Sequence, residues 1–465
     1  MSNQAKYNSL RQTFSEFVYE SYQYDVQPDG LHIVFTFRIG DRFVFTPSAV
    51  IPRRSFLCFD QPDDILNTLV FNIGMIELIS YWKCICPPVV TVRCGHLSES
   101  QILFWKKLYF NGLGEFFYIN GIHATLDDFL QITSREGSEF PCYPVHPAFQ
   151  YLSNHLVPIG GGKDSVVTLE LLSSQTPAND SPQHRPVPLI MNPRGATVGC
   201  IQAAGYTMDE VLVIQRSIHP LLLDLNSQGY LNGHTPFSAM LAFYTLLAAQ
   251  LSGIPNVALS NESSANESTV VGTGINHQYS KSLEFENDFR QYVSEFISPA
   301  YNYFSFLRPL SELQIAMLFS RYSQYFGVFR SCNAGSKQDI WCGKCAKCLF
   351  AYIILSPFIA PQQLNAIFGK NMLDDPDMEH FLLELTGQAE TKPFECVGTI
   401  DEVNTALCLT LNRWYPDERP TLLRNYSPKP SHPANLSQLL PDHNLTPSLI
   451  NLLQKNVQAD ICKCT

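Results

Sequence analysis

The chain has 465 residues, 45% of them hydrophobic, which is enough for two or three domains with substantial cores. A net charge of −11 argues against a protein that gains its affinity from nucleic-acid phosphates. The N-terminus, MSNQAKYNSLRQ, lacks the apolar core of a signal peptide, and no apolar run approaches the length that crosses a membrane. We therefore expect a soluble cytoplasmic protein with neither a nucleic-acid nor a membrane partner.

Residues 1–135 are predicted to form an N-terminal α+β domain. Two β-rich runs within residues 31–50 are separated by Gly40-Asp41, a pattern typical of a hairpin. Helical patterns follow over residues 63–79 and 98–110. The residues alone leave open whether this domain caps a ligand site or only packs and dimerises, and they do not predict the oligomeric state.

A proline-containing linker is predicted over residues 136–150, followed by a domain over residues 151–330. In this domain apolar strand-like runs alternate with helical ones, which predicts an α/β fold with a parallel sheet and helices on both faces. The strand-like runs lie at residues 155–159, 187–192, 210–215 and 256–260, with a long helix at 236–251. Ligands of such sheets bind beyond the carboxyl ends of the strands, so polar side chains directly after these runs are candidates for a site.

A glycine-rich loop follows the first of these runs, where residues 159–165 read IGGGKDS before a predicted helix over 165–172. Glycines lack a Cβ, so their backbone N–H groups can converge on an anion, and the helix start adds a partial positive charge. The spacing matches neither a Walker loop nor a dinucleotide-binding motif. The residues predicted to bind nucleotide phosphates are Gly160, Gly161, Gly162, Lys163, Asp164 and Ser165. The alternative is a tight strand-to-helix turn that binds no ligand.

Four cysteines have the spacing of a structural zinc site. Cys332, Cys342, Cys345 and Cys348 form C-x9-C-x2-C-x2-C, and four thiolates complete a tetrahedral Zn²⁺ site with no open position. The alternative is four unconnected core cysteines. In a long chain without a secretion signal reduced thiols are expected, so the pairs at 84 and 86 and at 462 and 464 are predicted to be plain thiols.

The remaining chain is predicted to contain a zinc knuckle over residues 331–360 and a helical region over residues 361–415. The tail, residues 416–465, begins with a segment rich in proline and arginine and ends with a short helix near 448–456.

The loop and the cysteines together resemble one enzyme superfamily. The loop is similar to the S-G-G-x-D-S motif of the PP-loop ATP pyrophosphatases, with Gly160 where that family usually has Ser, and the four-cysteine pattern resembles that of the 7-cyano-7-deazaguanine synthases. The layout as a whole, up to about residue 425, looks like that of the UDP-N-acetylmuramoyl-L-alanyl-L-glutamate epimerase family, MurL. The stretches that carry this likeness are residues 74–83, 104–122, 158–172, 276–289 and 392–399.

This resemblance implies a PP-loop fold and an isomerase coupled to ATP cleavage. The implied reaction is epimerisation of the terminal L-Glu of UDP-N-acetylmuramoyl-L-Ala-L-Glu to D-Glu in peptidoglycan precursor biosynthesis, with ATP converted to AMP and diphosphate. It further implies that the protein requires ATP and Mg²⁺ and contains structural Zn²⁺. An unneutralised carboxylate would repel ATP, so Asp164 is expected to ligate Mg²⁺ or to orient the loop.

Other polar residues are assigned roles by their type and position. Asn192 and Asn261 follow predicted strands and are expected to contact ATP. Arginine binds diphosphate or carboxylate groups bidentately, which suggests Arg194, Arg290 and Arg308 as substrate-binding residues. The candidates for catalysis and proton transfer are Asp164, Glu262, His277, Lys281 and Cys396. A structural role remains the alternative for each of them.

Two other functions fit the same motifs. A deazaguanine-type synthase would use the loop and the zinc cluster to adenylate a heterocyclic acid, and it would depend on ammonia. A nucleotide-binding protein that leaves ATP intact would release no pyrophosphate. The sequence does not reveal how UDP is recognised, or whether one base or two move the proton.

Overall fold

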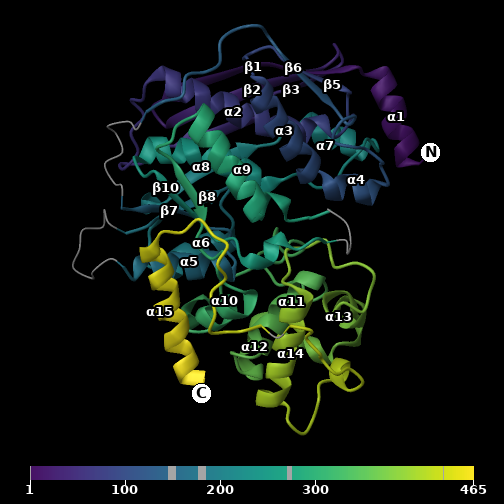
Figure 1. Cartoon of the computed structure of the whole chain (residues 1–465), viewed down its shortest axis with the longest axis vertical. Coiled ribbons are helices and arrows are strands. Elements are labelled where there is room, and N and C mark those ends of the chain that lie inside the picture. The colour runs from purple at the N-terminus through teal and green to yellow at the C-terminus, as the bar shows by residue number, and fades with distance from the viewer. Residues whose placement is uncertain (1, 145–152, 176–184, 270–274, 433, 465) are drawn as a thin grey trace. The chain divides into compact units, whose positions relative to one another are not determined.

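The computed structural model describes residues 2–144, 153–175, 185–269, 275–432 and 434–464, with the side chains of 461–464 left out, and it has a mixed α/β fold (Figure 1). The chain divides into two compact units that alternate along the sequence. The first unit comprises Met1–Leu156, Leu212–Val257 and Gln278–Tyr303, and the second comprises Val157–Val211, Ala258–His277 and Phe304–Thr465. Each unit is described here by itself.

The first unit is built on a mixed sheet in the order β9-β4-β2-β1-β5-β6, with β3 also paired to β2. Strands β1 and β2 are antiparallel, with Phe17 opposite Ile39, whereas β5 runs parallel to β1. The strands are β1 (Glu16–Gln27), β2 (Gly30–Ile39), β3 (Phe43–Phe45), β4 (Ser48–Pro52), β5 (Val89–Val92), β6 (Gln131–Ser134) and β9 (Leu212–Ser217). The predicted hairpin within residues 31–50 is confirmed as β2 and β3, in which Ile39 pairs with Phe43.

Helix α2 (Asp63–Trp82) is the central helix of the first unit and packs on β1 and β2. A Cβ on Gly74 would lie 1.8 Å from the Tyr19 hydroxyl, so only glycine allows α2 to approach β1 this closely. The helix is long and apolar enough to span a membrane, but 94% of its apolar window is buried in the structure. A helix in the core of a folded domain is buried in the same way.

The other helices of the first unit surround this core. The patterns predicted at 63–79, 98–110 and 236–251 are confirmed as α2, α3 and α8, with ends that differ by at most three residues. These other elements are α1 (Asn3–Thr13), α3 (Glu99–Gly112), α4 (Gly114–Asn120), α7 (Pro220–Ser227), α8 (Phe237–Ser252), η4 (Tyr279–Lys281) and α9 (Leu283–Phe296).

Strands β7 (His155–Pro158), β10 (Asn256–Leu259) and β11 (Asn302–Ser305) each cross from the first unit into the second. Strands β7 and β10 are parallel, as predicted, with Asn256 opposite His155. In the second unit the Ile159 N–H just beyond β7 donates to Leu189 of β8 (Val187–Met191), and the Phe306 N–H donates to Leu259 of β10. The strand predicted at 210–215 is β9, and it pairs antiparallel with β4, so the sheet is mixed rather than purely parallel.

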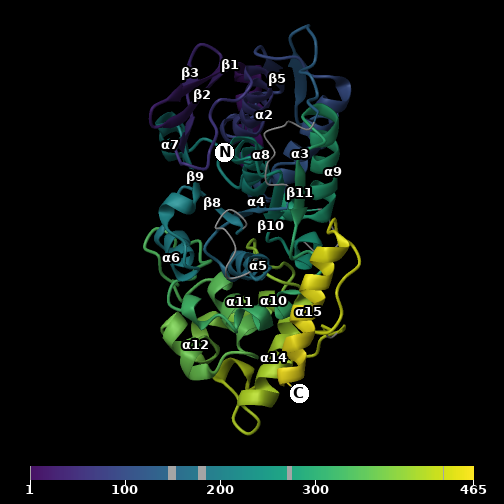
Figure 2. The same ribbon diagram turned by 90° about the vertical axis from the view of Figure 1, so that its left-hand side faces the viewer.

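The helices of the second unit gather around α10 and α11, as both views show (Figures 1 and 2). Helix α15 packs on α10, and at 18 residues it is twice as long as the final helix predicted near 448–456. The α-helices are α5 (Lys163–Ser173), α6 (Gly195–Ala203), α10 (Glu312–Phe319), α11 (Ala346–Leu355), α12 (Pro361–Phe368), α13 (Glu379–Leu385), α14 (Ile400–Trp414) and α15 (Pro447–Cys464). The 3-10 helices are η2 (Met208–Glu210), η3 (Ser263–Asn266), η5 (Ser323–Tyr325), η6 (Met372–Asp374), η7 (Pro376–Met378) and η8 (Thr421–Leu423).

Candidate active site

The glycine-rich loop connects β7 to α5 in the second unit, as predicted. Gly161 has φ +85°, and a Cβ there would lie 3.1 Å from Ala196 and Thr197 at the start of α6, so this position requires glycine. Its carbonyl oxygen accepts from the Arg330 N–H at 2.8 Å. A Cβ on Gly160 would meet no atom within 4 Å, so the loop is open beside this residue.

Helix α5 begins with the charged residues of the loop. The Lys163 side chain is buried, and its ammonium group donates to the carboxylates of Asp164 and Glu312. The Ser165 hydroxyl donates to the Gly162 carbonyl at 3.1 Å, and the Asp164 side chain is 32% exposed. The loop therefore presents one lysine that is already held by two carboxylates and one aspartate that solvent reaches.

Glu312 was not predicted, yet it is the residue that links the loop to the C-terminal helices. It is the first residue of α10, its side chain is buried, and its N–H donates to Glu402 Oε1 at 2.7 Å. Glu402 lies in the first turn of α14, where Oε2 accepts from the Thr399 N–H at 2.7 Å in a capping box. The sequence contains a helix-start signal near both residues. Glu312 directly follows the N-cap Ser311, and Glu402 is the third residue after the N-cap Thr399.

Burial and neighbouring charges perturb these carboxylates. Burial raises the pKa of Glu312 to about 8; the Lys163 ammonium opposes this shift, while Asp164, Glu262 and Glu402 add to it. Burial likewise raises the pKa of Glu402. The Lys163 ammonium is shared by two carboxylates, and two more carboxyl groups act on Glu312, so a bound proton on Glu312 is favoured.

The segment after β10 brings three of the predicted residues together. Asn261 donates to the Ser305 hydroxyl at 3.0 Å. Arg308, only 1% exposed, donates to the Glu262 carbonyl oxygen at 2.7 Å and to the Ser305 hydroxyl at 3.1 Å. Arg308 therefore holds this segment in place from within the unit, and a direct contact with substrate stays a prediction.

The other predicted residues are spread over both units. Asn192 and Arg194 are exposed between β8 and α6, and Asn192 has a left-handed φ of +52°. Lys281 and Arg290 lie in the first unit, where Arg290 donates to Asn302 Oδ1 at 2.9 Å and to the Tyr303 carbonyl at 2.5 Å. The structure therefore does not place these two in the same unit as the loop.

His277 and Cys396 lie near a carboxylate that the sequence reading missed. Burial raises the pKa of Glu395; the charge of Lys347 opposes this shift, Cys345 of the cysteine cluster and Cys396 add to it, and His277 opposes it. Its Oε2 accepts from Asn333 Nδ2 at 2.7 Å. No periodic or spacing signal marks Glu395, because it lies in an irregular segment between α13 and α14.

The four predicted metal ligands form one cluster. The Sγ to Sγ separations are 3.8 Å for Cys332 to Cys345, 3.7 Å for Cys342 to Cys348 and 3.5 Å for Cys345 to Cys348. They are close to the edge of a tetrahedron whose Zn–S bonds are about 2.3 Å. Gly343 has φ +66°, which forms the tight turn between two ligands. The cluster can hold a metal ion. Cys84 and Cys86 are buried free thiols, whereas the side chains of Cys462 and Cys464 lie outside the described residues.

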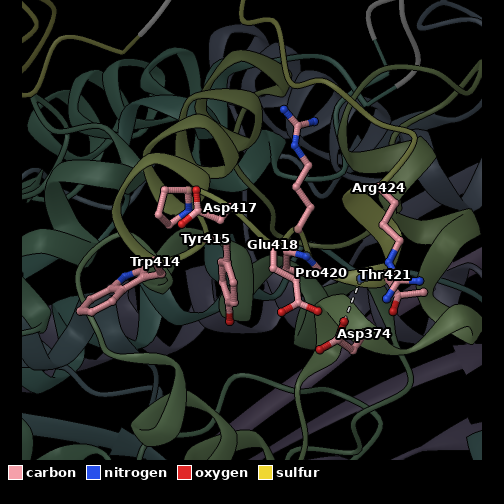
Figure 3. A pocket seen from close by; sticks show the side chains of 10 residues that line it. Asp374, Trp414, Tyr415, Asp417, Glu418, Pro420, Thr421 and Arg424 are labelled. Atoms are coloured by element: carbon pink, nitrogen blue, oxygen red, sulfur yellow. Dashed lines mark hydrogen bonds between the residues drawn. The ribbon is translucent and has the colours of Figure 1, made fainter.

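A surface pocket lies elsewhere in the second unit, at the C-terminal end of α14 (Figure 3). Asp374, Glu418 and Tyr415 line it, and Asp374 Oδ1 accepts from the Thr421 N–H at 2.8 Å. None of the predicted site residues lines this pocket, so we base the candidate active site on the loop and its carboxylates.

Comparison with known proteins gives matches along most of the chain. The family model of the MurL N-terminal domain matches residues 8–306, and that of the MurL C-terminal domain matches residues 328–432. Three relatives bear the name UDP-N-acetyl-alpha-D-muramoyl-L-alanyl-L-glutamate epimerase. The relative from Xanthomonas oryzae pv. oryzae is 32% identical over 84% of either chain. The relative from Micromonospora sp. is 36% identical over 78% of this chain and 79% of its own, and that from Salinispora tropica is 33% identical over 78% of each. No solved structure matches this chain.

Proposed function

Because this chain belongs to the MurL family, we propose that it epimerises the terminal L-glutamate of UDP-N-acetyl-alpha-D-muramoyl-L-alanyl-L-glutamate to D-glutamate. The protein is then an isomerase that acts on a small-molecule precursor of peptidoglycan. The observation that carries this conclusion is the likeness to three epimerases over 78–84% of the chain. The two matched regions include both the glycine-rich loop and the cysteine cluster.

The substrate of such an enzyme is a poor carbon acid. Epimerisation removes the Cα proton of the terminal glutamate, but the adjacent free α-carboxylate is negative and opposes a carbanion. Each pK unit of missing acidity adds about 1.4 kcal/mol to the barrier. We infer that the carboxylate is first adenylated with ATP, because the acyl group then carries no charge and its carbonyl oxygen accepts the developing electron density.

The proposed reaction has three steps. A carboxylate oxygen attacks the α-phosphorus of ATP, and the bond from that phosphorus to the bridging oxygen breaks, so pyrophosphate leaves. A base takes the Cα proton, and an acid returns a proton to the opposite face of the planar carbon. Water then cleaves the acyl adenylate into AMP and the D-glutamyl product.

The loop between β7 and α5 supports the placement of ATP in the second unit. Its order of strand, glycines and helix start resembles that of a PP-loop, and the open space beside Gly160 leaves room for phosphate oxygens. Ser165 and the backbone N–H groups of the loop are assigned to the phosphates. Mg²⁺, when bound, would neutralise phosphate charge, and the partly exposed Asp164 is the residue assigned to it.

The proton-transfer groups are assigned among the polar side chains of the family's matched regions. His277, Cys396 and Glu262 belong to the second unit, as the loop does, and Lys281 to the first. Glu395 joins them because its charge interacts with those of His277 and Cys396. The cysteine cluster has four sulfur ligands and no open position, so we assign it a structural Zn²⁺ rather than a role in the reaction.

One assay tests the proposal. The protein is incubated in D₂O with ATP, Mg²⁺ and the UDP-muramoyl-dipeptide, and the chirality of glutamate, deuterium at its Cα, AMP and pyrophosphate are measured. We expect D-glutamate with deuterium at Cα and one pyrophosphate per adenylation. Epimerisation without ATP would contradict adenylation, and ammonia-dependent product without epimerisation would favour a deazaguanine-type synthase instead.

A further inference from the structure

We propose that Glu312 and Glu402 are positioning residues that hold the ammonium group of Lys163 where it meets a phosphate of ATP. This inference rests on the proposed function, because it assigns Lys163 to ATP. It adds two residues from α10 and α14 that the sequence does not predict to the loop between β7 and α5.

The contacts form a continuous chain within the second unit. The Thr399 N–H donates to Glu402, the other oxygen of Glu402 accepts from the Glu312 N–H, and the Glu312 carboxylate accepts from Lys163. The Lys163 ammonium also donates to Asp164, its neighbour on α5. The start of α14 therefore fixes the start of α10, and the start of α10 fixes the lysine of the loop.

The geometry leaves Lys163 able to act on a ligand. An ammonium group has three N–H donors, and two of them point to Asp164 and Glu312. Within the described residues no other acceptor of this ammonium is recorded, so its third donor is available to a phosphate oxygen. A lysine on a flexible four-carbon stem loses rotamer freedom when it binds, and a side chain already held by two carboxylates has lost that freedom in advance.

Glu402 has a specific reason to be a carboxylate. The first N–H groups of a helix lack partners within the helix, and the Glu312 N–H is one of these. Glu402 accepts from this N–H with one oxygen and from Thr399 with the other, so both of its oxygens are used. A glutamine at 402 keeps the shape but retains only one accepting oxygen.

A double-mutant cycle tests the inference. Glu312→Gln, Lys163→Met and the combined variant are compared with wild type by ATP-dependent pyrophosphate release, with KM for ATP and kcat determined separately. We expect Glu312→Gln to raise KM for ATP about tenfold with a smaller change in kcat when assayed above pH 8, because the amide still accepts from Lys163 but lacks the negative charge that Glu312 carries there. In the combined variant the Glu312 substitution has no further effect, because the lysine on which it acts is gone.

Matched variants separate positioning from folding. Glu170→Gln removes a carboxylate from the same helix α5, where Glu170 accepts from the Tyr325 hydroxyl, and it should leave KM for ATP unchanged. Glu402→Gln should raise KM less than Glu312→Gln does. Thermal unfolding of each variant shows that it is folded, and Glu312→Asp, which keeps the charge on a shorter side chain, replaces Glu312→Gln if that variant does not fold.

The outcomes distinguish two failures. If wild type releases no pyrophosphate with the UDP-muramoyl-dipeptide, the proposed use of ATP fails and this inference fails with it. If wild type is active and folded Glu312→Gln keeps its KM, or if the effects of the two substitutions multiply in the combined variant, only the positioning role is overturned.

Discussion

Two buried ion pairs, one in each compact unit, differ in how well their charges balance. In the first unit Arg216 of β9 donates to both oxygens of Glu77 of α2, at 2.5 and 2.7 Å, and the Tyr244 hydroxyl of α8 adds a bond of 3.0 Å. One guanidinium thus meets one carboxylate with geometry that satisfies both. In the second unit the Lys163 ammonium donates to two carboxylates, Asp164 and Glu312, and the charges of Glu262 and Glu402 also act on Glu312.

The difference separates a structural pair from a reactive cluster. A bidentate pair with matched charge needs nothing else, and it joins β9, α2 and α8 of the first unit. An excess of buried carboxylates is costly until a cation or a proton arrives, and such imbalance is characteristic of functional sites. Burial of charge alone therefore does not identify a site, whereas unmatched charge does.

The largest effect is expected where the balanced pair is broken. Arg216→Met leaves Glu77 buried with the Tyr244 hydroxyl as its recorded donor, and it should lower the free energy of unfolding by about 3–5 kcal/mol. Denaturant unfolding measures this loss. A change below about 1 kcal/mol would mean that water reaches Glu77, so that its charge does not depend on Arg216 for compensation.

The pH dependence of stability should report the unbalanced cluster. Because the pKa of Glu312 is raised to about 8 in the folded protein, the folded state keeps a proton that the unfolded state has released, so stability falls as pH rises from 5 to 8. One such group contributes a slope of at most about 1.4 kcal/mol per pH unit.

Glu312→Gln should reduce this slope, and thermal unfolding from pH 5 to 8 measures it. The groups that face Glu312 are Lys163 and Asp164 of α5, Glu262 after β10, and Glu402 of α14. Glu402 also has a raised pKa, so a smaller slope remains in the variant. An unchanged slope would show that Lys163 keeps Glu312 ionised throughout this range.

A smaller effect is expected at the loop itself. Gly161→Ala places a Cβ at φ +85° and 3.1 Å from α6, which should cost about 1–3 kcal/mol of stability and weaken ATP binding. Gly160→Ala is the matched control, because its Cβ meets no protein atom. Equal stability of the two variants would show that the loop moves away from α6 without penalty.

The smallest change removes one hydroxyl from the balanced pair. Tyr244→Phe takes away the bond to Glu77 Oε1 while Arg216 remains, so the free energy of unfolding should fall by about 1 kcal/mol. Calorimetry or denaturant unfolding measures this. A loss as large as that of Arg216→Met would mean that the tyrosine, rather than the guanidinium, satisfies the carboxylate.

Local patterns were sufficient to predict the loop, the cysteine cluster and several of the strands and helices. Strand-to-helix order around residues 159–165 and the 3.6-residue periodicity of 63–79 depend on neighbouring residues, so they are visible in the sequence. Strand β1, although rich in aromatic residues, was not predicted because its burial does not alternate: residues 17–19 are buried in succession and the remainder is half-buried or exposed. The antiparallel pairing of β9 with β4 depends on contacts between distant segments, and no local pattern encodes it.

Separation along the chain is also the reason that two site residues were not predicted. Glu312 and Glu402 lie about 150 and 240 residues beyond the loop, and only the folded chain brings them to Lys163. The capping patterns near Glu312 and Glu402 predict where two helices begin. They do not predict that Glu402 accepts from the Glu312 N–H. Arg308 was predicted to bind substrate from its residue type, and the structure adds that it is 1% exposed and donates to the Glu262 carbonyl.

The capping box at Thr399 and Glu402 sets a lower limit on the fragment that can be used to test the proposed binding of ATP. A truncated protein that ends at residue 330 would contain the glycines, Lys163 and Glu312, but the Glu312 N–H would lose its acceptor. An isolated nucleotide-binding fragment would then begin α10 with an unsatisfied amide. A fragment expressed for crystallography or inhibitor screening should therefore include all of α14, which ends at Trp414.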